Sequence, residues 1–153
     1  MFAALATTLC LAAQNPFVQT WYTSDPAPMV HNGTLYVYTG HDEDRADFFW
    51  MQEWRVYSTQ DMVNWQDHGS PLALESFSWA DDRAWASQCI ERNGKFYWYI
   101  CAHSRLSNGM ATQVYYAKLN DDMISIDGEV QKLDMTEEAF GGPITTSSDR
   151  TTT

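Results

Sequence analysis

The fold of this chain is indicated by one stretch that occurs twice: His31-Asn32-Gly33-Thr34-Leu35-Tyr36-Val37-Tyr38 and Arg92-Asn93-Gly94-Lys95-Phe96-Tyr97-Trp98-Tyr99. The copies are 61 residues apart (31 to 92), and the segment 61–65 returns at the same offset as 122–126. Asn-Gly between apolar runs is the strongest short-range signal for a β-hairpin. Short aromatic and β-branched strands that repeat at a fixed period are typical of β-propeller blades.

The repeat predicts an all-β chain with two blade units, at about 25–68 and about 84–128. In the first hairpin both faces carry apolar side chains, with Tyr36 and Tyr38 on one and Leu35 and Val37 on the other. Such a sheet must be covered on both sides, as a blade is by its neighbours. Because propellers contain about four to eight blades, residues 15–140 are expected to form part of a propeller: two units plus a fragment.

Composition excludes some partners and favours others. Nine basic against twenty acidic residues give a formal net charge of −11, which argues against a nucleic acid or an anionic membrane as partner. The chain also contains 7 Trp, 8 Tyr and 7 Phe residues. Aromatic rings on this scale serve core packing and also suit stacking against sugar rings.

The two ends differ from the repeated region. Residues 1–14 carry a short apolar run, from Phe2 to Ala13, that is either a clipped secretory signal peptide or a buried edge. A signal peptide would predict a secreted or periplasmic protein. Residues 141–153 are polar with nothing to bury, which predicts a disordered tail.

The cysteines do not predict a disulfide. If Asn93-Gly94 is a two-residue turn, Cys89 lies opposite Trp98, and Cys101 points to the other face of the sheet. Cys89 and Cys101 are therefore expected to be free thiols packed as small apolar side chains.

One end of the first hairpin gathers polar residues. The same register places Asp25 opposite Gly40, beside His41 and Asp42. The matching position of the second unit is Ala86, so the repeat itself does not require the acid. From the pattern alone, Asp25 is either a functional carboxylate or a turn opener before Pro26.

Other polar residues near this end also have two interpretations. Trp85 and Gln88 begin the second unit, where they either bind a sugar by stacking and hydrogen bonding or pack a blade and end an edge strand. His41 and Asp42 either contact substrate or tie the loop to its neighbour. The run 41–44 contains four potential metal ligands, but consecutive strand residues alternate faces, so no metal site is predicted.

Several of these segments together resemble glycoside hydrolase family 43. Residues 22–30 and 36–43 are similar to its first blade, and residues 57–65 and 84–99 extend the resemblance into its second. The resemblance covers roughly residues 15–140 and is greatest to arabinofuranosidases that debranch xylan and to β-xylosidases. It implies a five-bladed propeller enzyme whose reaction inverts the configuration at the anomeric carbon of the sugar.

The resemblance also implies roles for the candidate residues. The Asp of the first-blade Asp-Pro motif is the general base, a role that falls on Asp25. From their positions at the same end, we expect His41, Asp42, Trp85 and Gln88 to be substrate-binding residues. The implied partner is a plant cell-wall polysaccharide or oligosaccharide. No cofactor is implied; full-length relatives can hold calcium, which the residues here do not support.

The chain departs from the family pattern in its other carboxylates. A second Asp-Pro strand and the Glu-Gly-Pro segment that supplies the general acid are both missing from the sequence. Glu137 and Glu138 resemble an inter-blade linker and are not assigned the acid role. The expected alternatives to an enzyme are a non-catalytic carbohydrate-binding fragment and an inactive truncated gene product.

Overall fold

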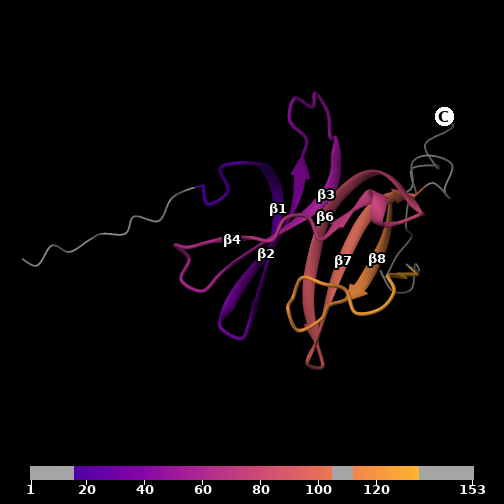
Figure 1. The fold of residues 1–153 in the computed structure, drawn as a ribbon. Coiled ribbons are helices and arrows are strands. Elements are labelled where there is room, and N and C mark those ends of the chain that lie inside the picture. The colour runs from indigo at the N-terminus through magenta and orange to yellow at the C-terminus, as the bar shows by residue number, and fades with distance from the viewer. Residues whose placement is uncertain (1–15, 105–111, 135–153) are drawn as a thin grey trace, which may run out of the picture.

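The computed structural model describes residues 16–104 and 112–134. The predicted signal segment 1–14, the tail 141–153 and the pair Glu137 and Glu138 lie outside these ranges. Within them, no helix has the length and apolar character needed to cross a bilayer. The described chain forms two antiparallel sheets joined by a short linker (Figure 1).

The first sheet has the strand order β1-β2-β3-β4, and β5 pairs with β3 beside β4. Each strand follows its neighbour in sequence, as expected of a blade built from consecutive hairpins. The strands are β1 (Tyr22–His31), β2 (Thr34–Asp42), β3 (Met51–Thr59), β4 (Gln66–Asp67) and β5 (Leu72–Ala73).

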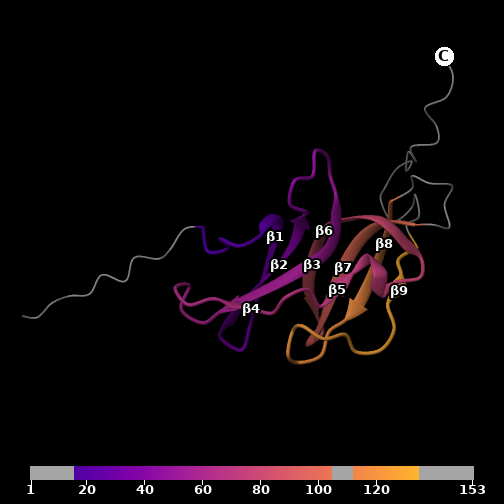
Figure 2. The same ribbon diagram turned by 45° about the horizontal axis from the view of Figure 1, so that its top comes forward.

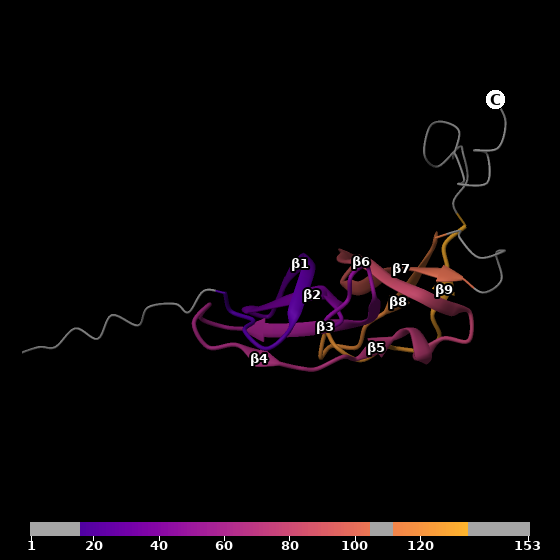
Figure 3. The ribbon, with the colours of Figure 1, turned by 90° about the horizontal axis from the view of Figure 1, so that it is seen from above.

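The second sheet repeats this order as β6-β7-β8-β9. Its strands are β6 (Ala80–Arg92), β7 (Lys95–Ser104), β8 (Thr112–Lys118) and β9 (Gln131–Lys132), and the 3-10 turn η1 (Leu74–Ser76) lies in the linker before it. The sheet thus starts before residue 84 and ends after residue 128, the bounds expected from the repeat. Figure 3 shows the two sheets side by side, and the view of Figure 2 agrees.

The sequence repeat is confirmed in the backbone. Asn32 and Asn93 have φ of 47° and 55°, and the glycines after them have φ of 75° and 70°. Positive φ at both central residues is what a type I′ hairpin turn requires, and Asn-Gly meets that need at low cost. The later turns match too, because Met62 and Met123 have φ of 59° and 61°.

The core lies where the two sheets meet. Tyr38 of β2 and Trp98 of β7 are both fully buried, with ring centroids 5.0 Å apart. Trp54 of β3, also fully buried, donates its indole N–H to the backbone carbonyl of Trp85 at 2.6 Å. The buried aromatic side chains of Tyr38, Trp54 and Trp98 therefore hold the two units together.

Cys89 and Cys101 are both free, as predicted. The observed register pairs Cys89 with Trp98, while Cys101 pairs with Trp85 across β6 and β7. Burial raises the pKa of the Cys89 thiol to about 11 and also raises that of Cys101. Both thiols are consequently protonated at neutral pH and unsuited to nucleophilic chemistry.

Candidate active site

Asp25 lies on a β-bulge in β1, and its side chain is exposed. The expected pairing of Asp25 with Gly40 is wrong: Ser24 lies opposite Gly40, and Ala27 opposite Tyr38, so the register shifts between them. Counting back from the turn assumes a regular ladder, which an extra residue in one strand breaks. The bulge leaves Asp25 without a paired residue on β2.

The backbone of Asp25 adopts the left-handed region, with φ of 51°. This region is uncommon for residues other than Gly, although Asp tolerates it better than most. The second unit has a register shift at the matching place, between Trp85 and Gln88, yet Ala86 has no positive φ. The bulge thus repeats, whereas the carboxylate and its left-handed conformation belong to the first unit alone.

The two predicted partners of Asp25 on β2 differ in exposure. His41 is 2% exposed, and its Nδ1 lies 3.4 Å from Glu53 Oε1 with the ring of Trp21 edge-on at 5.1 Å between centroids. His41 is therefore packed beneath the surface and is not among the residues that line the pocket described next, so its predicted contact with substrate stays a prediction. Asp42, half-buried and opposite Tyr22, is the member of the pair that faces open space.

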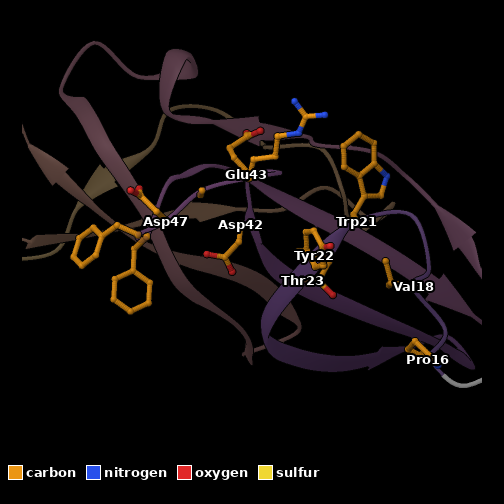
Figure 4. A pocket seen from close by; sticks show the side chains of 12 residues that line it. Pro16, Val18, Trp21, Tyr22, Thr23, Asp42, Glu43 and Asp47 are labelled. Carbon is orange, nitrogen blue, oxygen red and sulfur yellow. The ribbon is translucent and has the colours of Figure 1, made fainter.

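A pocket of about 880 Å³ lies between the start of β1 and the loop after β2, and is called here the β1–β2 pocket (Figure 4). Its walls combine aromatic rings with carboxylates, the mixture that binding sites for small organic ligands commonly show. Its lining residues are Pro16, Val18, Trp21, Tyr22, Thr23, Asp42, Glu43, Arg45, Ala46, Asp47, Phe48 and Phe49. Asp42 is therefore in the pocket, while Asp25 lies two residues beyond Thr23.

Trp85 and Gln88 are placed differently by β6. The half-buried Trp85 ring lies 5.5 Å from that of Phe49 and 5.7 Å from that of His103, between ring centroids. Gln88 is exposed opposite Tyr99, and no described contact joins it to Asp25. The structure therefore brings Trp85, but not Gln88, against the loop that lines the β1–β2 pocket.

Sequence reasoning missed an arginine under the pocket. The Arg55 guanidinium lies 4.2 Å from the centre of the Trp21 ring and forms a 2.7 Å ion pair with Glu53, the neighbour of His41. Arg55 lies in a segment whose sequence pattern predicts only a packed strand, so no local signal marks it as a residue of the site. It fixes the orientation of Trp21 at the pocket wall.

The described residues contain no group of three or more His, Cys, Asp or Glu side chains arranged to hold a metal ion. Within the run 41–44, His41 is buried, Asp42 and Glu43 are half-buried and Asp44 is exposed; β2 ends at Asp42, so the expected alternation of strand faces does not extend over the run.

A five-stranded and a four-stranded sheet, each with four strands in the order of the sequence, pack on each other and define neighbouring blade units of a β-propeller. At one end they carry an exposed carboxylate beside an acidic and aromatic pocket. Comparison with known proteins agrees with this class, because residues 13–118 match "Glycosyl hydrolases family 43". The chain belongs to this family.

The chain is similar to a xylosidase/arabinosidase of Bacteroides ovatus, with 37% identity over 88 residues, which are 52% of this chain and 27% of that protein. It is also similar to xylosidase/arabinosidase 43A of Humicola insolens, with 31% identity over 59% of this chain and 31% of that protein. A GH43_1 enzyme from Xanthomonas citri, solved in complex with xylotriose, matches 66% of this chain at 33% identity and a TM-score of 0.58. This match spans 30% of the solved chain. The present chain thus covers about a third or less of each of these proteins.

Proposed function

We propose that this chain supplies the general-base part of an inverting glycoside hydrolase that acts on glycosides derived from xylan or arabinoxylan. The observation that carries the proposal is the placement of Asp25. Its carboxylate is exposed on a left-handed bulge residue that the second unit does not reproduce. Non-Gly residues in strained backbone regions cluster at functional sites.

An inverting mechanism needs two carboxyl groups on opposite sides of the scissile bond. One carboxylate takes a proton from the attacking water, and a carboxylic acid about 6.5–9.5 Å away protonates the leaving oxygen. Asp25 fits the first role because it is solvent-exposed and has no cationic partner among the described ion pairs. The acid role is not assigned to any residue of this chain, and the reaction needs no cofactor.

The substrate class follows from the pocket and the relatives. Trp21 and Tyr22 offer ring faces at its wall, and Asp42 offers hydrogen-bond acceptors for hydroxyl groups. The relatives are named for xylosidase and arabinosidase activities, and one solved neighbour contains xylotriose. A plant cell-wall polysaccharide or its oligosaccharides would place the working protein in a secreted or periplasmic compartment.

The test is turnover of 4-nitrophenyl α-L-arabinofuranoside and β-D-xyloside by the purified chain. Asp25→Asn should abolish release of nitrophenol, because the amide cannot accept the proton of water. Asp81→Asn is the matched control, since Asp81 is an exposed carboxylate of β6 that does not line the β1–β2 pocket. Measurable turnover that is equal in Asp25→Asn and Asp81→Asn would reject Asp25 as the base.

A second candidate is carbohydrate binding without turnover. It is favoured by one observation: the 153 residues contain a single Asp-Pro pair and no Glu-Gly-Pro segment. A folded chain that binds xylotriose but releases no nitrophenol from either substrate would establish this candidate and reject catalysis by this chain.

A further inference from the structure

The two Asn-Gly turns share one backbone conformation but differ in how the glycine amide is bound. Both turns are exposed, both have positive φ, and a Cβ added at either glycine would meet nothing within 4 Å. The Gly94 amide donates a hydrogen bond of 2.5 Å to Glu91 Oε1. No side chain in the described ranges offers such an acceptor to the Gly33 amide. The turns are therefore a matched pair that differs in one contact.

This difference comes from one position of the repeat. Glu91 lies two residues before Asn93 on β6, opposite Phe96. The copies are 61 residues apart, so the equivalent residue of the first unit is Val30, opposite Leu35 on β2. Val30 is 66% exposed, and its side chain has no hydrogen-bond acceptor. The sequence thus supplies a carboxylate to one turn and an apolar side chain to the other.

The first turn also contacts the second blade unit. The side-chain nitrogen Nδ2 of Asn32 lies 2.9 Å from His31 Nε2. The ring of His31 in turn lies 4.5 Å from that of Phe96, between ring centroids. Figure 1 shows the two hairpin turns projecting at the same end of the molecule. A change at Asn32 therefore occurs next to a contact between the units.

We propose that Asn32 is a site of spontaneous deamidation and that Glu91 protects Asn93 from the same reaction. The backbone nitrogen of Gly33 gives up its proton and attacks Cγ of Asn32. The Cγ–Nδ2 bond then breaks, the nitrogen leaves with that proton as ammonia, and a five-membered succinimide ring remains. Water opens the ring at either of its two carbonyls, which leaves aspartate or isoaspartate at position 32.

The attacking nitrogen must be accessible and must lose its proton. Glycine leaves that nitrogen uncovered because it has no side chain. A hydrogen bond to a carboxylate stabilises the protonated amide, and the negative charge of the carboxylate opposes formation of an amide anion. Glu91 exerts both effects on Gly94. Val30 exerts neither on Gly33, so the two turns differ in reactivity although their backbones match.

Deamidation changes both the charge and the length of the first turn. Aspartate places a negative charge where the neutral amide lies beside His31. Isoaspartate routes the main chain through the side-chain carbons and so lengthens it, and the register of a hairpin depends on the length of its loop. The hairpin of β1 and β2 is therefore open to a chemical change that the hairpin of β6 and β7 resists.

The test is incubation of the folded chain at mildly alkaline pH, followed by peptide mass spectrometry that locates each conversion of amide to acid. Asn32 should convert about tenfold faster than Asn93 in the same sample. Glu91→Ala should raise the rate at Asn93 toward that at Asn32. Val30→Glu, the reciprocal variant, should lower the rate at Asn32 toward that at Asn93. Both substitutions are at exposed positions, and circular dichroism verifies that each variant is folded.

A denatured sample is the control for the fold. Once the contact of Glu91 with Gly94 is lost, the two asparagines should convert at similar rates. Absence of conversion at Asn32, equal rates in the folded chain, or a missing effect of either Glu91→Ala or Val30→Glu would overturn the inference. A preference for Asn32 that persists unchanged in denaturant would also overturn it, because its cause would then be the local sequence. None of these rates depends on turnover of a glycoside, so failure of the proposed function leaves this inference standing, and the reverse.

Discussion

The phenol of Tyr38 donates a hydrogen bond of 2.6 Å to the backbone carbonyl of Met123, 85 residues later in the chain. Both residues are fully buried, and they belong to different blade units. Met123, the acceptor residue, has a left-handed backbone conformation within the turn 122–125. The counterpart of this turn in the first unit is the turn 61–64. A turn that repeats for local reasons thus provides the acceptor that joins one blade to the next.

We expect Tyr38→Phe to lower the free energy of unfolding by about 1–3 kcal/mol, because it leaves the buried Met123 carbonyl without a donor. The measurement is urea unfolding followed by tryptophan fluorescence. Tyr99→Phe is the control, since Tyr99 holds the same place in the second unit but is half-buried and its hydroxyl makes no hydrogen bond within the described ranges. Equal losses in the two variants would contradict the role of the inter-blade bond.

We expect Asp122→Ala to destabilise the chain by about 0.5–1 kcal/mol, the cost of removing an exposed capping carboxylate. Its Oδ1 accepts the amides of Ile124 and Ser125, both at 2.9 Å, and its Oδ2 accepts the Ser125 hydroxyl at 2.6 Å. Burial opposes the charge, but these bonds outweigh it and lower the pKa of Asp122. Urea unfolding at neutral pH measures the loss.

The same variant changes the pH dependence of stability. A carboxyl with a lowered folded pKa stabilises the fold above its unfolded pKa, and that contribution is lost as pH falls through the folded pKa. Asp122→Ala should therefore lose less stability on acidification from neutral pH than the unaltered chain. Identical acid profiles would show that the turn bonds do not depend on the charge of Asp122.

Cys89 should make the chain less stable in alkali. Burial raises its pKa from 9.0 to about 11, so the folded state keeps the proton that the unfolded state releases. Its contribution is complete below pH 9 and is lost as pH rises through about 11. The fall in unfolding free energy between about pH 8 and about pH 10.5 should be smaller in Cys89→Ala than in the unaltered chain. Equal falls would exclude Cys89 as a source of alkaline sensitivity.

Arg55→Lys should destabilise the first blade unit by about 1–2 kcal/mol despite keeping the charge. The guanidinium contacts Glu53 at 2.7 Å, the Tyr57 hydroxyl at 3.1 Å and Asp67 at 3.3 Å. A lysine ammonium lacks the planar arrangement of N–H donors that reaches all three partners at once. The measurement is thermal unfolding by circular dichroism. Lys132→Arg on the exposed strand β9 is the control for a conservative charge exchange. An unchanged midpoint in Arg55→Lys would show that the network adds nothing to stability.

Local chemistry made the hairpins and turns predictable. Asn32-Gly33 and Asn93-Gly94 specify tight turns because their residues accept positive φ, and the residues on either side then pair in order. The pairing of Cys89 with Trp98 follows from that count and is observed.

The same count failed further from the turn. It placed Asp25 opposite Gly40, but Ser24 occupies that position because the bulge inserts an extra residue. A count of residues from the turn cannot detect such a bulge, because the count assumes that both strands contribute equal numbers of residues. The count is wrong by one residue, and a shift of one residue moves every side chain to the opposite face of the sheet.

The sequence by itself determined the β-propeller class, the repeated blade unit and the polar corner near Asp25, because these depend on turn chemistry and on alternation within about ten residues. Only the tertiary structure decided which side chains meet there. It buried His41 under Trp21, set Arg55 against that ring and brought Phe49 onto Trp85 from another sheet. Contacts between sheets depend on how two twisted surfaces pack, and spacing along one strand contains no information about that packing.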